Sequence, residues 1–336
     1  MSASRSLGAT LAGVALLLLA LCVLSLLIGA GDVGPLDSLR TLLGGGDDDA
    51  RFTVFTLRLA RTELALLVGV ALGVAGLLMQ AVSRNPLAEP GLLGVSAGAS
   101  FAVVVAIALG ATAATLNLAV AMLGALGGCA LVLMVTRLRG VGEDPVRLVL
   151  AGAAFSGLLQ ALTGTLLLWD QRTADEMRFW VVGSLAGRPL ETLQGSLPGL
   201  LLGLAIALPL VRPLAALALG ERVATGLGHH PNAVRLGCLL AVALLVGTAN
   251  AAAGPIAFLG LIVPYLARRL VGTDVRRCMG LCLLLGPCVL LIADILSRLA
   301  VRPYELPVGV VTAFVGAPIL ILVVRGQRLP TLQNNR

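Results

Sequence analysis

Long apolar segments alternate with short polar interruptions along the whole chain of 336 residues. Ten segments resemble membrane spans, and they cover residues 7–29, 62–82, 92–110, 115–136, 147–169, 192–211, 234–250, 256–267, 279–298 and 306–325. A straight span needs about 20 residues, so the short runs near residue 250 are either broken helices that line a pathway or tilted, shielded helices. We predict an all-α polytopic membrane protein with about ten transmembrane helices in a single domain, residues 1–336.

One polar interruption, residues 84–100 (RNPLAEPGLLGVSAGAS), has an unusual sequence for a connection between two spans. It holds the only two charges of a long apolar region, Arg84 and Glu89, together with Pro86 and Pro90. Proline lacks a backbone donor and disfavours helix in the residue before it. A break of this kind must lie where water or protein satisfies its backbone. We therefore expect a working turn in a membrane machine.

The composition agrees with a membrane protein and limits its chemistry. Hydrophobic residues make up 58% of the chain and charged residues 12%, about half the roughly 25% typical of soluble domains. All 24 basic residues are arginine. Most of them lie on one side in the ten-span arrangement, which predicts that both termini are cytoplasmic. This pattern indicates membrane lipid, and no nucleic acid, as the chain's surroundings.

The absence of lysine also excludes a standard nucleotide-binding P-loop, which needs a lysine at the phosphates. We therefore predict no cofactor in this chain, so any ATP and Mg²⁺ must be bound by a partner ATPase. No acid–base pair, nucleophile elbow or metal cluster stands out in the sequence, which predicts that the chain is not an enzyme.

Arginines also occur at the outer helix ends, against the usual charge bias. Arg58 and Arg61 lie at the start of the second span, and Arg298 and Arg302 at the end of the ninth. This cluster could dock an acidic partner, or its side chains could anchor helix ends by snorkelling. The spacing alone leaves both interpretations open.

Asp294 lies four residues before Arg298, so an ion pair along one helix is the simplest interpretation. The alternative is that Asp294 or Glu63 carries protons in a secondary transporter, because intramembrane carboxylates often do so. Glu305 precedes a predicted helix start, where its charge would complement the helix dipole.

Residues 220–230 (GERVATGLGHH) predict a short helix between glycines inside a cytoplasmic segment, 212–235, that is too polar to span. His229 and His230 are adjacent and would point in different directions on a helix, so we predict no metal site there. Cys278 and Cys282 could suit a metal by their spacing, but small buried hydrophobic side chains are the favoured interpretation.

Several stretches together resemble one family. They are RLAR (58–61), GLLMQAVSRNPLAEPGLLGVSAGAS (76–100), WVVGSLAG (180–187), LGERVATGLG (219–228), GPIAFLGLIVPYLAR (254–268) and LIADILSRLAVRPYELPVGVVTAFVGAP (291–318). On these motifs the chain is similar to permease subunits of the FecCD family, the ABC importers of iron-siderophores, haem and vitamin B12.

The resemblance implies the type II ABC importer fold in a bacterial cytoplasmic (inner) membrane. Two permease subunits, as a homodimer or with a paralogue, would surround one pathway for an iron chelate. Two ATPase subunits and an extracytoplasmic substrate-binding protein would complete the importer.

The resemblance also implies roles for individual residues. The docking residues are Arg58, Arg61 and Arg298; the cytoplasmic gate residues are Asn85, Pro86 and Leu87; the ATPase-coupling residues are Gly220, Glu221, Ala224, Leu227 and Gly228. Two positions depart from the family pattern: Ala60 replaces a usual proline and Tyr265 a usual histidine. The second departure removes any ring-nitrogen contact of that histidine. The motifs do not identify the chelate.

Overall fold

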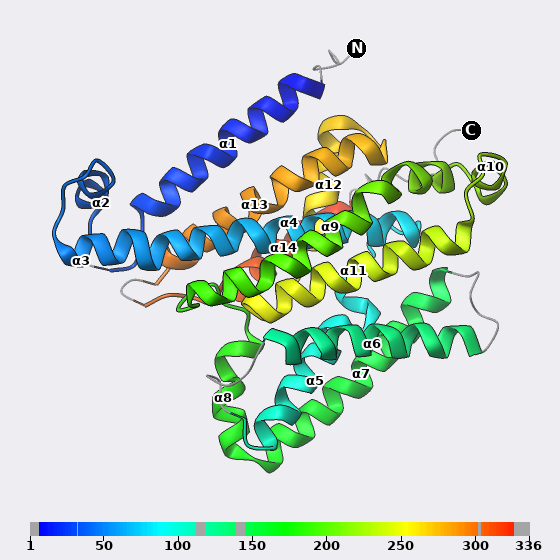
Figure 1. Cartoon of the computed structure of the whole chain (residues 1–336), viewed down its shortest axis with the longest axis horizontal. Coiled ribbons are helices and arrows are strands. Elements are labelled where there is room, and N and C mark those ends of the chain that lie inside the picture. The colour runs from blue at the N-terminus through cyan, green and yellow to red at the C-terminus, as the bar shows by residue number, and fades with distance from the viewer. Residues whose placement is uncertain (1–6, 32, 112–117, 139–144, 302–303, 326–336) are drawn as a thin grey trace.

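The computed structural model describes residues 7–31, 33–111, 118–138, 145–301 and 304–325, and these residues form helices joined by short loops (Figure 1). The helices are α1 (Leu7–Leu27), α2 (Pro35–Leu42), α3 (Asp48–Arg51), a π-helical turn (Phe52–Arg58), α4 (Leu59–Val82), a 3-10 turn (Pro90–Leu93), α5 (Val95–Ala108), α6 (Leu118–Leu138), α7 (Pro145–Trp169), α8 (Gln171–Val181), α9 (Leu190–Ala218), α10 (Glu221–Gly226), α11 (Pro231–Ala253), α12 (Leu259–Val271), α13 (Val275–Leu299) and α14 (Val308–Arg325).

Each of the ten predicted spans falls on a separate helix, and the all-helical fold class is confirmed. Six helices of the described chain are long and apolar enough to cross a membrane: Leu7–Leu27, Asp48–Val82, Leu150–Trp169, Leu190–Ala218, Pro231–Ala253 and Val275–Leu299. Helices α5, α6, α12 and α14 fall short of that measure in their described parts, so their crossing stays a prediction. The start of the span 115–136, most of the connection between the spans 115–136 and 147–169, and both termini lie outside the described residues.

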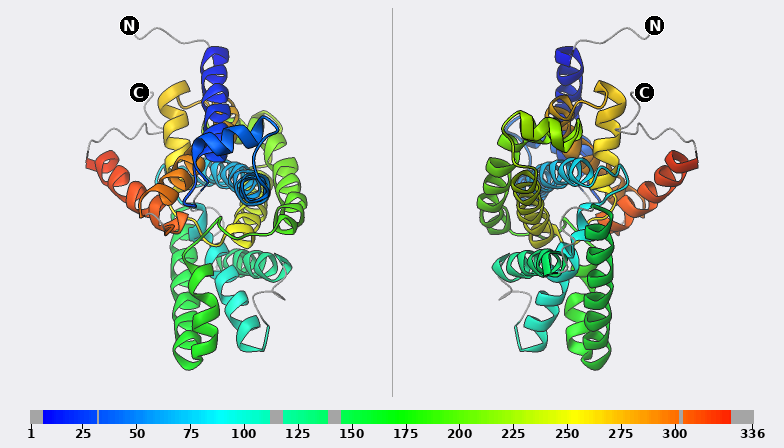
Figure 2. Two further views of the ribbon diagram at one scale, coloured as in Figure 1. Left: turned by 90° about the vertical axis from the view of Figure 1, so that its left-hand side faces the viewer. Right: turned by 90° about the vertical axis from the view of Figure 1, so that its right-hand side faces the viewer.

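Helix α4 is the centre of the fold. It packs against α9, α11, α12 and α13 (Figures 1 and 2), and most of its residues are buried. Small residues allow this, because a Cβ atom on Gly76 would lie 1.9 Å from the carbonyl oxygen of Gly260 in α12. Membrane helices use such residues to bring their backbones into contact. The glycine-rich sequence of α4 therefore determines how closely its neighbours approach.

A second group, α5, α6 and α7, lies beside this body with α8 across its end (Figure 1). Its helices also meet at glycines, since a Cβ atom on Gly98 of α5 would lie 2.3 Å from the carbonyl oxygen of Gly124 in α6. Helix α14 extends away from the central body in both side views (Figure 2) and contacts α12 and α13. The space between the two groups and α14 holds the second of the two cavities described below.

Several helices continue beyond the predicted spans, because prolines and polar residues do not always end a membrane helix. The helix that holds the second predicted span is continuous from Asp48 to Val82, so it begins well before residue 62. Helix α9 continues past residue 211 to Ala218 with Pro213 inside it, and α11 continues past residue 250 to Ala253. Neighbouring helices supply the packing that lets such helices continue.

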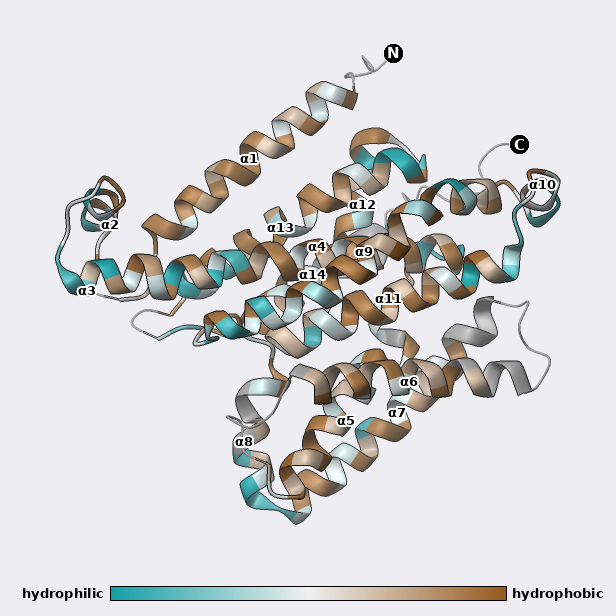
Figure 3. Cartoon of the chain, viewed as in Figure 1, coloured by the Kyte–Doolittle hydropathy of each residue, from teal (hydrophilic) through white to brown (hydrophobic). Residues whose placement is uncertain are grey.

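Hydrophilic residues gather around α2, α3 and α10, whereas hydrophobic residues cover much of α1, α9 and α13 (Figure 3). The molecule therefore has two polar ends. We call the end with Arg61 the arginine end and the end with Arg84 the turn end. Helix α10 lies at the turn end, because the Arg84 guanidinium donates to the carbonyl oxygen of Leu217 near the end of α9, at 3.0 Å.

Candidate functional site

The arginine end is organised by three buried guanidinium groups. Arg58, at the end of the π-helical turn, is 5% exposed. Its guanidinium donates to the carbonyl oxygens of Leu26, Leu27 and Val33, and at 2.8 Å to Ser38 Oγ. Leu26 and Leu27 end α1, and a cation there complements the helix dipole. Arg58 thus joins the end of α1 to α4.

Arg61 and Arg298 share one buried carboxylate. Arg61 Nε donates to Asp294 Oδ1 at 2.7 Å, and Arg298 donates to Asp294 Oδ2 one turn along α13. Arg61 also pairs with Glu305 ahead of α14 and donates to Ser297 Oγ at 3.2 Å. Two cations and two anions balance. Such compensation is what makes buried charges tolerable.

Arg298 extends this network to the first helix. Its guanidinium donates to the backbone oxygens of Ser25 and Ile28 and to Ser25 Oγ, at 2.8, 3.1 and 2.9 Å. The side chain is 1% exposed and Asp294 is fully buried. The predicted pair of Asp294 with Arg298 is therefore confirmed. Both oxygens of Asp294 are held by arginine, a geometry that supports a structural ion pair rather than a proton carrier.

The three predicted docking arginines thus lie together, yet each has partners inside the chain. They border a cavity of about 790 Å³ whose wall also includes Glu63, Ala60, Glu305 and Arg188. Their docking role stays a prediction. We call this cavity, with the residues of its wall, the outer cavity.

Arg188 is a residue of the outer cavity that the sequence analysis did not single out. It lies half-buried in the loop before α9, and burial lowers the pKa of its guanidinium. Within the described part of the chain it makes no side-chain hydrogen bond or ion pair. Its charge is therefore available to an incoming anion, unlike those of Arg58, Arg61 and Arg298. Its neighbours in the sequence are mostly apolar and Pro189 follows it, so no local pattern predicts a binding role for it.

At the turn end, the predicted gate residues build the turn itself. Asn85 Oδ1 accepts the backbone N–H of Leu87 at 2.9 Å, a side-chain turn typical of asparagine. Pro86 and Leu87 are half-buried, and Arg84 has a positive φ of 50°. Asn85 therefore fixes the turn, while the gate role of Asn85, Pro86 and Leu87 stays a prediction.

Glu89 joins this turn to the start of α12. Its carboxylate accepts the backbone N–H of Phe258 at 2.8 Å, and Phe258 precedes α12 with a φ of 66°. Burial raises the pKa of Glu89, and the hydrogen bond from Phe258 counteracts part of that rise. Next to it, Pro90 packs on Gly260. The turn is thus attached to the central body by a carboxylate and a proline.

The predicted coupling segment is helical where expected. Helix α10 lies between Gly220 and Gly228, whose φ angles of 125° and 81° favour glycine. Glu221 forms an ion pair with Arg235 of α11, and Ala224 is fully buried. Leu227 is 63% exposed and its neighbour Val223 is also exposed. An apolar pair on so short a helix leaves a surface that a partner could cover, although the coupling role itself stays a prediction.

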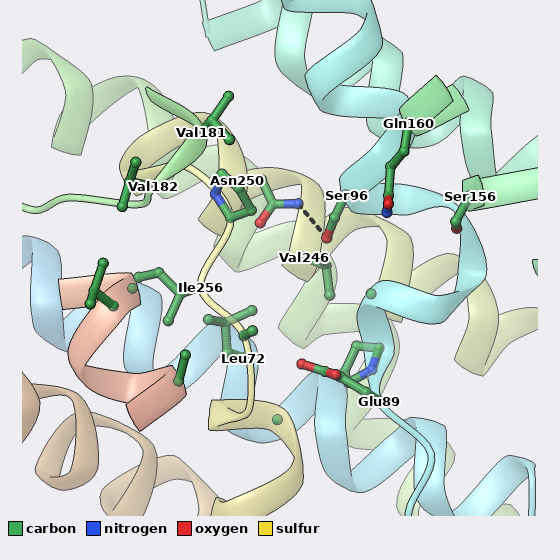
Figure 4. A pocket seen from close by; sticks show the side chains of 18 of the residues that line it. Leu72, Glu89, Ser96, Ser156, Gln160, Val181, Val182, Val246, Asn250 and Ile256 are labelled. Atoms are coloured by element: carbon green, nitrogen blue, oxygen red, sulfur yellow. Dashed lines mark hydrogen bonds between the residues drawn. The ribbon is translucent and has the colours of Figure 1, made fainter. Parts of the chain in front are cut away.

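A second cavity, of about 530 Å³, lies between α4, the turn, α5, α7, α11, α12 and α14. Figure 4 shows its polar side chains: Ser96 of α5, Ser156 and Gln160 of α7, Asn250 of α11, and Glu89. We call it the inner cavity. Glu89 stood out in the sequence as a charge in the turn, whereas Ser96, Ser156, Gln160 and Asn250 were not predicted as site residues. Their signal in the sequence is that each is a polar residue among apolar neighbours.

Three other features of the sequence have simple places in the fold: Tyr265, the cysteines and the two histidines. Tyr265 lies on α12, where its hydroxyl oxygen accepts from Arg269 Nε at 3.1 Å, one turn later. All six cysteines are free, and five of them, including Cys278 and Cys282, are buried, as the sequence analysis favoured. His229 and His230 belong to no cluster of metal-binding side chains among the described residues.

The FecCD transport family model matches residues 17–326 of this chain. The chain belongs to the FecCD transport family. It is 47% identical over 316 residues to the ferric enterobactin transport system permease protein FepD of Escherichia coli (strain K12), covering 93% of this chain and 94% of that protein. It is 38% identical to the hemin transport system permease protein HmuU of Yersinia pestis, covering 93% and 95% of the two chains.

Among solved structures, one described as an inward-facing conformation of a metal-chelate type ABC transporter matches with a TM-score of 0.81 and 30% identity. The match covers 94% of this chain and 99% of the other. The FecCD fold therefore extends over nearly the whole molecule, from α1 to α14.

Proposed function

We propose that this FecCD-family chain is the membrane permease subunit of an ABC importer that moves an iron(III) chelate into the cell. The observation that carries the proposal is the match over residues 17–326, together with 47% identity to a ferric enterobactin permease along nearly its full length. Other relatives are named as permeases for hemin and for Fe(3+) dicitrate, so these related chelates remain candidate substrates. A siderophore ranks first because the more identical of these relatives handles one.

Energy for import would come from a separate ATPase, because the chain has no lysine for a P-loop. The ATPase would contact the turn end through α10, where Leu227 and Val223 are exposed. Both chain termini would lie on that same cytoplasmic side of the inner membrane. A short helix whose base is fixed by Ala224 and the Glu221–Arg235 pair can transmit a push to α9 and α11.

An extracytoplasmic binding protein would dock at the arginine end. There the outer cavity presents Arg188, which has no hydrogen-bond or ion-pair partner among the described residues, in the same wall as Arg58, Arg61 and Arg298. A basic surface steers an acidic partner and determines its orientation. Two permease chains, identical or paralogous, would then enclose the pathway, and native mass spectrometry of the purified complex would count the copies.

The proposal is tested by iron uptake in cells that lack their own ferric permeases. Expression of this chain with its ATPase and binding protein should restore uptake of radioactive iron supplied as ferric enterobactin. Replacing the P-loop lysine of the ATPase should abolish it. Unchanged uptake with the inactive ATPase would contradict the proposal and favour a proton-driven carrier.

A further inference from the structure

The wall of the inner cavity contains a buried hydroxyl group, that of Ser156. Ser156 is 8% exposed, and its Oγ makes no hydrogen bond among the described residues. Buried hydroxyl groups are nearly always hydrogen-bonded, because a buried polar group without a partner loses its bonds to water and gains none in return. Ser156 nevertheless lies in the wall of the inner cavity, next to open space. A group that enters the cavity would satisfy it.

The other polar groups of the cavity wall are also arranged to donate hydrogen bonds. Asn250 is 2% exposed, and its Nδ2 donates to Ser96 Oγ at 3.0 Å, the dashed contact in Figure 4. Because Ser96 Oγ accepts that bond, its own hydrogen is free to point elsewhere. Gln160 lies one turn after Ser156 on α7 and belongs to the same wall, so its amide adds two further donors.

The charge of the cavity wall limits what could bind there. Among the described residues that line it, Glu89 is the one with a charged side chain, and no arginine is among them. An anion would therefore gain nothing from charge pairing in the inner cavity, in contrast to the outer cavity with its four arginines. Neutral donors instead suit the oxygen atoms of a ligand, whose contacts with them are individually weak. Weak contacts allow a ligand to leave again, as transport requires.

We propose that the inner cavity is a transit subsite that binds the oxygen-rich surface of an iron(III) chelate through Ser96, Ser156, Gln160 and Asn250. Phe314 and Val310 of α14 supply an apolar wall for the rest of the chelate. The inference rests on the proposed function, and it adds that α7 helps to select which chelate passes. Selection there follows from the number of ligand oxygens that the donors can reach.

The test uses the complete complex, reconstituted with its ATPase and binding protein, and four probes: ferric enterobactin, ferric citrate, a ferric hydroxamate and hemin. Uptake per ATP hydrolysed is compared between wild type, Ser156→Ala and Gln160→Leu. The matched control is Thr163→Val, because Thr163 is also a buried, unpartnered hydroxyl on α7 but lies outside the cavity wall.

The inference predicts that Ser156→Ala and Gln160→Leu lower uptake of the preferred probe about three- to tenfold, as loss of one hydrogen bond would. It also predicts a changed ratio of uptake between probes, which a general loss of stability would not produce. Thr163→Val should leave that ratio as in wild type. If both cavity variants show the wild-type ratio and rate, the inference is wrong while the proposed function stands.

A second measurement applies even if Ser156→Ala fails to fold. Gln160→Cys in the assembled complex should react with a small maleimide, and excess ferric chelate should slow that reaction severalfold. The control Leu158→Cys lies on the same helix, exposed and outside the cavity wall, and should show no protection. Equal labelling of Gln160→Cys with and without chelate would overturn the inference. A wild-type complex that transports none of the probes would overturn the proposed function with it.

Discussion

The arginine end and the inner cavity differ in how their buried polar groups are paired. Around Asp294 each charged group has a charged partner, so Arg61, Arg298 and Glu305 form one network of ion pairs with it, in which Arg298 Nε is left without an acceptor among the described residues. In the inner cavity the hydroxyl of Ser156 has no hydrogen-bond partner in the part of the chain that the structure describes. The difference separates polar groups that hold the fold from polar groups that are open to a ligand. By the same criterion Arg188 belongs to the open class, and the exposed apolar side chain of Leu227 is likewise open to a partner.

The largest effect is expected from breaking the network of ion pairs around Asp294. Asp294→Asn leaves two buried guanidinium groups without their shared anion, which should lower the free energy of unfolding by about 3–5 kcal/mol. Thermal unfolding in lipid nanodiscs measures it. The control is Asp37→Asn, because Asp37 pairs with Arg40 at the surface of α2 and such pairs are worth at most about 1 kcal/mol. Equal losses in the two variants would show that the network is not what holds this end together.

Next in size is the effect of a charge on the exposed apolar surface of α10. Leu227→Glu should reduce ATP-driven uptake about twentyfold, because it places a carboxylate at the surface proposed to be covered by the ATPase. Protein stability should hardly change, since Leu227 is 63% exposed. Leu36→Glu, at an exposed leucine of α2 on the arginine end, is the matched control. Normal coupled uptake by Leu227→Glu would place the ATPase contact elsewhere.

A smaller effect is expected at the open arginine. Arg188→Glu should weaken binding-protein docking about fivefold at low salt and less at high salt, because salt screens the attraction between charges that solvent reaches. Surface plasmon resonance of the nanodisc-embedded complex gives the affinity. Arg40→Glu, exposed on α2 and outside the wall of the outer cavity, should have less effect. Identical affinities for both variants would remove Arg188 from the docking surface and leave the internally paired arginines as candidates.

The smallest effect concerns Glu89. Its pKa is raised by burial, so folding favours the protonated carboxyl, and this contribution is complete below the ordinary value of 4.5 and lost as pH rises through the raised pKa. Wild type should therefore lose stability relative to Glu89→Gln across that window, as followed by thermal unfolding against pH.

Asp170 is the control, because its ionisation should change stability with pH in the opposite direction from that of Glu89. Hydrogen bonds from Thr173 lower the pKa of this exposed carboxylate, which caps α8. Its contribution is present above the ordinary value of 3.8 and is lost as pH falls through the lowered pKa. A pH profile for Glu89→Gln that is parallel to wild type would show that the ionisation of Glu89 does not affect folding.

Much of the fold could be predicted from the sequence, because apolar runs are a local signal. The ten runs fall on ten helices, and the short helix between Gly220 and Gly228 was expected from its glycines. Helices α2 and α3 were missed because they lie in a polar, glycine-rich stretch. The early start of α4 and the late end of α9 were missed because tertiary packing keeps a helix intact beyond its apolar run.

The functional sites were harder to predict from the sequence than the fold. The pair Asp294–Arg298 has a helical spacing, but the bonds from Arg61 to Asp294 and Glu305 join residues 233 and 244 positions apart. No local sequence pattern predicts a contact between residues so far apart in the chain. The inner cavity likewise combines single polar residues from α5, α7 and α11, so only the folded chain brings Ser96, Ser156 and Asn250 together.

The most direct test of the central claim is transport by purified components. Proteoliposomes that contain this chain and its ATPase, with ATP enclosed and the binding protein outside loaded with radioactive ferric enterobactin, should accumulate iron. Omitting ATP or the ATPase should stop accumulation, and a proton gradient should not replace them. Accumulation driven by a proton gradient in liposomes that contain this chain alone would contradict the account.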